Sequence, residues 1–106
     1  MTLNIWALPK DKDVRATLLK LEQRLGSGHF ALSQRRCEHP GAVVLCKPDQ
    51  ADVVAYLYTF GQEPGCFGLH LEYPMFPGQP VMPPDIHENI SLDRVADLLR
   101  THFDIV

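Results

Sequence analysis

The chain has 106 residues, of which 45% are apolar and 22% charged, so we expect a single globular domain over 1–106. Its apolar runs, such as "AVVLC" at 42–46, are too short to cross a bilayer, and the N-terminus lacks the charged and apolar regions of a signal peptide. The three cysteines are an odd number, which favours free thiols in a reducing compartment, and we therefore expect a cytoplasmic protein.

The net charge of −3 conceals an uneven distribution of charge along the chain. Residues 1–48 carry eight Lys/Arg and four Asp/Glu, whereas residues 49–106 carry only Arg94 and Arg100 against nine Asp/Glu. An acidic region repels nucleic acid and anionic membranes and attracts cationic partners. We therefore expect a basic protein partner and neither nucleic-acid nor membrane binding. The alternative is an acidic surface that serves only solubility.

The first half of the chain indicates one helix and short extended segments. The apolar run at 4–8 is a strand or a docking segment. A helix is expected over 11–25, because Val14, Leu18, Leu21 and Leu25 recur on one helical face and Gly26 suits its C-terminal end. The alternating residues 29–33 indicate a strand, and the polar stretch 34–41, which ends in Pro-Gly, indicates a loop.

The second half indicates a sheet followed by a helix. Strands are expected at 42–47, 51–60 and 66–73, and the strand 51–60 is apolar on both faces, as a central strand is. A second helix is expected over 91–103, with Ser91 as its N-cap. The predicted fold is α+β: an antiparallel sheet of three to four strands with two helices packed on one face.

A proline-rich segment, "YPMFPGQPVMPPD" at 73–85, separates the last predicted strand from the second helix. Its prolines at 74, 77, 80 and 83 fall at the three-residue period of a polyproline II helix, which Gly78 would interrupt. One interpretation is a stiff crossover whose apolar residues, Met75, Phe76, Val81 and Met82, cover the core. The other is a partner-facing loop, in which apolar anchors within an acidic rim recognise a basic surface.

The residues that could support catalysis or cofactor binding do not form a recognisable motif. "HEN" at 87–89 lacks the second histidine of a zinc-protease helix, and no glycine-rich loop leads from a strand into a helix. We expect no metal and no cofactor. His70 and Glu72 share a strand face and could form an acid–base pair, and a cysteine could act as a nucleophile, so a small enzyme remains an alternative.

The stretch "FGLHLEYP" at 67–74, together with "ENISLDRVADLLRTHFDI" at 88–105, resembles small immunity proteins of bacterial contact-dependent or polymorphic toxin systems. The resemblance covers the C-terminal part of the chain and consists of a strand, a proline loop and a terminal helix. It implies a cytoplasmic protein that binds and blocks a toxic domain, often a nuclease. A nuclease surface must be basic to hold phosphates, so an acidic inhibitor gains fast association with it.

These observations predict a non-enzymatic, acidic binding protein, an immunity-type inhibitor that occludes a basic, nuclease-like toxin domain. The alternatives are a homodimeric structural or chaperone-like module and the small enzyme described above. The acidic residues steer the encounter, and the aromatic residues anchor the bound state. The expected partner-binding residues are Glu63, Glu72, Tyr73, Phe76, Asp85 and Glu88.

Overall fold

The computed structural model describes residues 5–35, 37–74, 77–80 and 83–105, and it is α+β, with two helices and a five-stranded antiparallel sheet. A short 3-10 helix, η1, opens the described chain. The elements in chain order are η1 (Ile5–Ala7), α1 (Lys12–Leu25), β1 (Ala31–Leu32), β2 (Ala42–Lys47), β3 (Gln50–Tyr58), β4 (Phe67–Glu72), β5 (Asp85–Ile90) and α2 (Leu92–His102).

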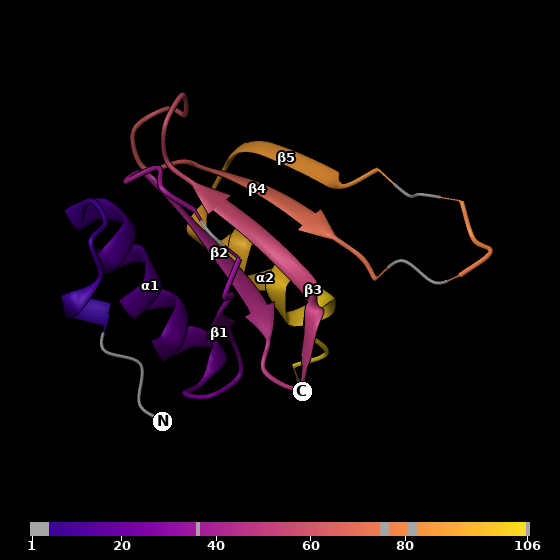
Figure 1. Ribbon diagram of the computed structural model, residues 1–106. Coiled ribbons are helices and arrows are strands. Elements are labelled where there is room, and N and C mark those ends of the chain that lie inside the picture. Colours follow the sequence, from indigo (N-terminus) through magenta and orange to yellow (C-terminus); the bar gives the residue numbers. More distant parts are fainter. Residues whose placement is uncertain (1–4, 36, 75–76, 81–82, 106) are drawn as a thin grey trace.

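The sheet is a simple meander in which each strand pairs with the next one along the chain, in the order β1-β2-β3-β4-β5 (Figure 1). Leu57 of the central strand β3 lies opposite Val43 of β2 and Leu69 of β4, so one face of the sheet is apolar across three strands. The order leaves two edges: β1, which has only two residues, and β5, which has six.

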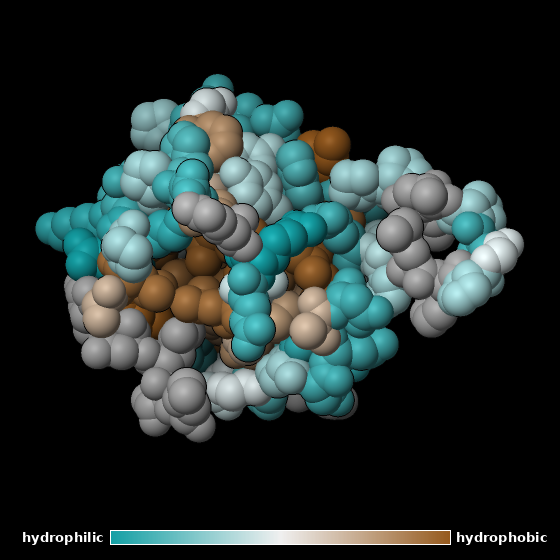
Figure 2. Space-filling view, viewed as in Figure 1, coloured by the Kyte–Doolittle hydropathy of each residue, from teal (hydrophilic) through white to brown (hydrophobic). Residues whose placement is uncertain are grey.

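Both helices contribute to the same apolar core. The apolar stripe of α1 predicted from the sequence is buried, and the strands turn alternate residues towards it because successive side chains of a strand point to opposite faces. Figure 2 shows apolar residues gathered in a hollow between α1 and the sheet, whereas the side near β5 is mainly hydrophilic. The core contains Val14, Leu18, Leu21 and Leu25 of α1, Val95, Ala96 and Leu99 of α2, Phe103, and Val43, Leu45, Val53, Ala55, Leu57, Leu69 and Leu71 of the sheet.

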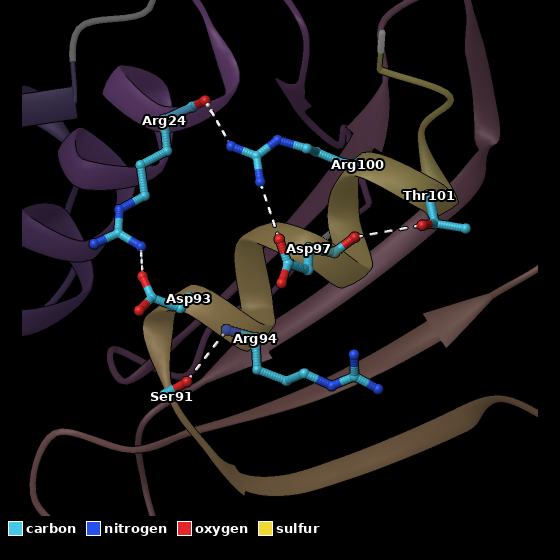
Figure 3. A network of polar contacts seen from close by, with 7 residues as sticks. All are labelled: Arg24, Ser91, Asp93, Arg94, Asp97, Arg100 and Thr101. Atoms are coloured by element: carbon cyan, nitrogen blue, oxygen red, sulfur yellow. Dashed lines mark hydrogen bonds and ion pairs between the residues drawn. The ribbon is translucent and has the colours of Figure 1, made fainter.

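Polar contacts join the end of α1 to α2 (Figure 3). Arg24 forms an ion pair with Asp93 in the first turn of α2, and the Arg100 guanidinium donates a hydrogen bond of 3.0 Å to the backbone oxygen of Arg24. Ser91 caps α2 as expected, since its Oγ accepts the Arg94 N–H at 3.2 Å. These contacts join α1 to α2 on the side of the sheet that carries both helices.

The structure corrects the predicted number of strands. The sheet has five strands rather than three to four, because residues 85–90, which we did not predict as a strand, form β5 against β4. The segment 4–8 was predicted as a strand or docking segment, but its described residues 5–7 form a 3-10 helix. Asp11 stands at the N-cap of α1, although its side chain makes no capping hydrogen bond.

The proline-rich segment is the connection of a β-hairpin and not a crossover to α2. It leaves β4, turns at residues 77–78, where Gly78 has φ +82°, and returns into β5, which runs antiparallel to β4. The described part of this connection extends away from the body of the molecule (Figure 1). Met75, Phe76, Val81 and Met82 lie outside the described residues, so the predicted apolar cover over the core stays a prediction.

None of the helices in the described part of the chain is both long and apolar enough to cross a membrane.

Candidate functional site

Most of the predicted partner-binding residues meet along one strand, the edge strand β5. Asp85 and Glu88 belong to β5, and Tyr73 and Glu63 contact its two ends through hydrogen bonds. Glu72 lies on β4, on the helix-free face, where it forms an ion pair with Arg35. Phe76 lies outside the described residues. The structure therefore brings four predicted residues together at one edge, although they are spread over more than twenty positions of the sequence.

The C-terminal end of β5 is held by the loop between β3 and β4. The Gln62 amide donates to Glu88 Oε2 at 3.0 Å, and Gln62 Oε1 accepts the Asn89 N–H at 2.6 Å. Asn89 Oδ1 in turn accepts the Glu63 N–H at 2.9 Å. Asn89 has a left-handed backbone, with φ +53°, at the β-bulge where β5 carries one extra residue opposite β4. Glu63 and Glu88 are exposed and adjacent as a result.

The N-terminal end of β5 is held by Tyr73. Its hydroxyl donates a hydrogen bond of 2.7 Å to Asp85 Oδ2, and its ring meets the His102 ring edge-on, with centroids 5.0 Å apart. The hydrogen bond to Asp85 and partial burial raise the pKa of the Tyr73 phenol, because both favour the neutral hydroxyl. Tyr73 still exposes 42% of its surface. It therefore joins β5 to the last turn of α2 and also offers an aromatic surface to solvent.

Ile86 is the most exposed large apolar side chain in the described part of the chain, with 56% of its surface accessible. It lies opposite His70 of β4, on the face of the sheet that carries no helix, between the acidic residues Asp85 and Glu88. A contiguous apolar patch rimmed by polar residues is typical of a site that contacts another molecule, and Ile86 supplies one side chain to such a surface. Ile86 is not among the partner-binding residues predicted from the sequence.

The helix-free face beside β5 is organised around Tyr58. A Cβ atom on Gly68 would lie 2.0 Å from the Tyr58 ring, so the ring lies directly over this glycine and occupies the space of its missing side chain. The Tyr58 hydroxyl is 3.1 Å from His70 Nε2. Burial, and then the nearby negative charge of Glu88, raise the pKa of the Tyr58 phenol. Glu88 is therefore close to this face, whereas Asp85, opposite Leu71, belongs to the helix-bearing face.

Glu72 is already engaged within the protein. Arg35, which follows β1, reaches across the helix-free face and binds both carboxylate oxygens of Glu72, one of them at 3.2 Å. The hydrogen bonds from Arg35 lower the pKa of the Glu72 carboxyl, against the opposing effect of its partial burial. This neutralised charge contributes less to attracting a cation than the carboxylates of β5 do.

The groups considered for catalysis are bonded to different partners. His70 contacts Tyr58, and Glu72 contacts Arg35, so the described hydrogen bonds do not join them to each other. Burial raises the pKa of the Cys46 thiol, which disfavours the nucleophilic thiolate. In the ranges that the structure describes, no three His, Cys, Asp or Glu residues are grouped closely enough to hold a metal ion.

The opposite edge of the sheet is short, and the loop that follows it is held in place by other parts of the chain. β1 pairs only with Cys46 and Leu45 of β2, and the following loop is held by the segment before α1. The Lys10 ammonium donates to the carbonyl oxygens of Cys37 and His39, at 2.7 and 3.0 Å, and the Asp11 N–H donates to that of Pro40 at 2.9 Å. The long exposed edge of the sheet is therefore that of β5.

Comparison of the chain with protein-family models, with curated proteins and with solved structures found no match.

Proposed function

We propose that this protein is a non-enzymatic, acidic binding protein of the cytoplasm that occludes a basic partner, as an immunity-type inhibitor occludes a nuclease-like toxin domain. The observation that carries this proposal is the character of the β5 edge. Asp85, Glu88 and Glu63 are exposed there. Ile86, on the helix-free face, and Tyr73, on the helix-bearing face, add exposed apolar and aromatic surface on either side of the same strand. Apolar and aromatic side chains with charged neighbours are the usual composition of a protein-binding surface.

Lysine and arginine are scarce near this edge. The sequence contains no Lys or Arg between Lys47 and Arg94, a stretch that supplies β3, β4 and β5. Within the described residues, the hydrogen-bond partners of Asp85 and Glu88 are the neutral side chains of Tyr73 and Gln62. No ion pair among the residues that the structure describes cancels their negative charges, so they can attract a cationic surface.

Such an arrangement favours rapid capture of a basic protein. Complementary charge raises the association rate constant from about 10⁵–10⁶ to as much as about 10⁸–10⁹ M⁻¹s⁻¹ at low salt. Apolar contacts, supplied here by Ile86 and Tyr73, then slow dissociation. For an inhibitor of a toxic enzyme both effects matter, because the partner has to be bound before it reaches its substrate.

The test is capture of the partner from a lysate of the native cells, followed by an activity measurement. The tagged protein is used as bait, the bound fraction is washed at low and then high salt, and proteins are identified by mass spectrometry. We expect one basic protein at a one-to-one ratio, released by salt. Its activity on RNA or DNA should fall to background when one equivalent of the protein is added. Capture without inhibition, or an acidic partner, would contradict the proposal.

A matched pair of variants locates the binding surface. Asp85→Lys with Glu88→Lys reverses two charges on β5, whereas Asp49→Lys with Asp52→Lys makes the same change in net charge at exposed positions two strands away. We expect the first variant to slow association with the captured partner at least about tenfold at low salt, and the second to change it much less. Equal effects of the two variants would mean that net charge, and not β5, determines capture.

A further inference from the structure

We infer that the partner binds by strand addition: an extended, cationic segment of the partner pairs with β5 and becomes the sixth strand of the sheet. This inference rests on the proposed function and specifies its binding mode. Surface charge alone would attract any basic patch. The structure indicates a more specific contact, because its two carboxylates on β5 do not share a face of the sheet.

The side chains of β5 are divided between the two faces of the sheet, and only the edge of the strand gives access to both. Asp85 lies opposite Leu71 and belongs to the helix-bearing face, where it contacts Tyr73. Ile86 lies opposite His70 on the helix-free face, and Glu88 affects Tyr58 on that same face. A partner resting on either face would meet only one of the two carboxylates. A strand placed beside β5 presents side chains to both faces and can meet both.

The backbone of β5 is available for this pairing. In an antiparallel pair, alternate residues direct both their N–H and C=O groups towards the neighbouring strand, so the residues between them direct theirs outwards. The described pairing of β5 is with β4 alone. Unpaired edges are templates for an additional strand, and natural edges are commonly guarded by lysine. Asp85 and Glu88 are the acidic residues of β5, beside the exposed Ile86 and the half-buried His87, and the strand contains no Lys or Arg, so it repels anionic strands and admits cationic ones.

The charge and spacing of the two carboxylates on β5 define the sequence pattern of the added strand. Asp85 and Glu88 are three positions apart, so the added strand needs cationic residues at positions i and i+3, which point to opposite faces. An apolar residue between them should lie opposite Ile86. The i, i+3 spacing of the two cations is the same whether the added strand is parallel or antiparallel to β5, whereas the residue opposite Ile86 is i+1 in a parallel strand and i+2 in an antiparallel one. A pattern with cations at i and i+2 would place both on one face and match one carboxylate only.

The experiment uses synthetic peptides and the full-length protein labelled with ¹⁵N. The matched peptide is Thr-Lys-Thr-Val-Lys-Thr, and its control, Thr-Lys-Val-Lys-Thr-Thr, has the same composition with the lysines at i and i+2. Each is titrated to millimolar concentration while amide chemical shifts are recorded. We expect shifts concentrated on residues 85–90, an affinity for the matched peptide about tenfold higher than for the control, and loss of these shifts in the Asp85→Lys, Glu88→Lys variant but not in the Asp49→Lys, Asp52→Lys variant.

Backbone N-methylation separates strand addition from charge attraction. Two derivatives of the matched peptide are made, each methylated at two alternate residues, so that one derivative loses the N–H groups facing β5 and the other loses those facing solvent. Charge is unchanged in both. We expect one derivative to bind at least about tenfold more weakly than the other, because hydrogen bonds worth about 0.5–1.5 kcal/mol each are lost in only one.

The outcomes distinguish the inference from the proposed function. Equal binding of the two methylated derivatives, together with weakening by Asp85→Lys and Glu88→Lys, would overturn strand addition and leave an electrostatic inhibitor. Absence of peptide-induced shifts at β5 would also overturn strand addition, while capture of a basic partner tests the proposed function independently. A concentration-dependent dimer in which the β5 amides are protected without peptide would show that a second copy occupies the edge, and would overturn the inference.

Discussion

The two edges of the sheet differ in how their backbone is used. Beside β2, the strand β1 is only two residues long, and the loop that follows it is held by hydrogen bonds from Lys10 and Asp11. At the opposite edge, β5 has six residues and no described neighbour beyond β4. Its ends are fixed by side chains, those of Tyr73 and Asn89, which leave the length of the strand uncovered.

An exposed edge strand can therefore be fixed at both ends without being covered along its length. Edge strands are usually protected by shortness, by a covering segment or by lysine. β1 is short and its continuation is covered. β5 has neither form of protection, and the side chains that fix its ends are the residues that line the candidate site. Fixing the ends reduces the conformational entropy lost when a partner binds, which is the advantage of a preorganised surface.

The largest expected effect contrasts the centre of the sheet with its open edge. Leu57→Ala in β3 should lower the free energy of unfolding by about 2–5 kcal/mol, because it leaves a cavity in a fully buried core. Ile86→Ala should lower it by less than about 0.5 kcal/mol, since Ile86 is mostly exposed, yet weaken binding of the matched peptide. Chemical denaturation of both variants checks this. A loss for Ile86→Ala comparable to that of Leu57→Ala would contradict the description of β5 as an open edge.

The next effect concerns the glycine beneath Tyr58. Gly68→Ala should lower the free energy of unfolding by about 1–3 kcal/mol, because the new Cβ would collide with the Tyr58 ring. The displaced ring should also lose its contact with His70. In a Tyr58→Val background, which leaves room above position 68, the same substitution should cost much less. Denaturation of the four proteins of this double-mutant cycle checks the coupling, and additive costs would contradict it.

At the β1 edge, Lys10→Ala should lower the free energy of unfolding by about 1 kcal/mol, because the carbonyl oxygens of Cys37 and His39 lose a charged donor. Amide hydrogen exchange should accelerate in the loop 37–41 and remain unchanged in β5. Lys12→Ala, at an exposed position in the first turn of α1, is the control and should change neither. Faster exchange in β5 would mean that the two edges are not independent.

The smallest effect is that of the ion pair between Arg35 and Glu72, which joins the two sides of the sheet. Since Arg35 lowers the Glu72 pKa below its ordinary value of 4.5, its stabilisation is present above that pH and is lost as the pH falls through the lowered pKa. Arg35→Ala should raise the Glu72 pKa and remove about 0.5 kcal/mol of stability at pH 7, and this loss should shrink as the pH falls through the lowered pKa of Glu72. A carbon-detected NMR titration of Glu72 and denaturation over a series of pH values check this. An unchanged Glu72 pKa would contradict it.

The helices and central strands could be predicted because their apolar periodicity records burial. The predicted strand 42–47 coincides with β2, and the predicted helix 11–25 differs from α1 by one residue. β5 could not be predicted in the same way. Its sequence, "DIHENI", shows no apolar alternation, since an exposed edge buries little, and the bulge at Asn89 interrupts the period. Pro83 and Pro84, which directly precede β5, also favour a loop at this position.

The candidate site was predictable in composition but not in arrangement. The acidic residues could be selected from the uneven charge and the aromatic residues from the proline-rich segment. Which of them lie together in the fold depends on long-range strand pairing. Glu63 and Glu88 are neighbours because side chains of Gln62 and Asn89 bond to backbone N–H groups across a loop, a contact that leaves no periodic signal. Likewise, nothing near Glu72 in the sequence indicates that Arg35, 37 positions earlier, binds it. The exposed apolar residue Ile86 could not be selected, because its exposure follows from its place on the edge strand β5.

The stretch without Lys or Arg has a practical consequence for chemical labelling. All lysines of the chain, Lys10, Lys12, Lys20 and Lys47, precede β3. Amine-reactive cross-linkers, acetylating reagents and biotin esters will therefore modify the first half of the molecule and leave its acidic edge unmodified. A contact at β5 would go unrecorded in such an experiment. Carbodiimide coupling, which joins a carboxylate to a partner's lysine, reverses this preference and should report Asp85 and Glu88 directly.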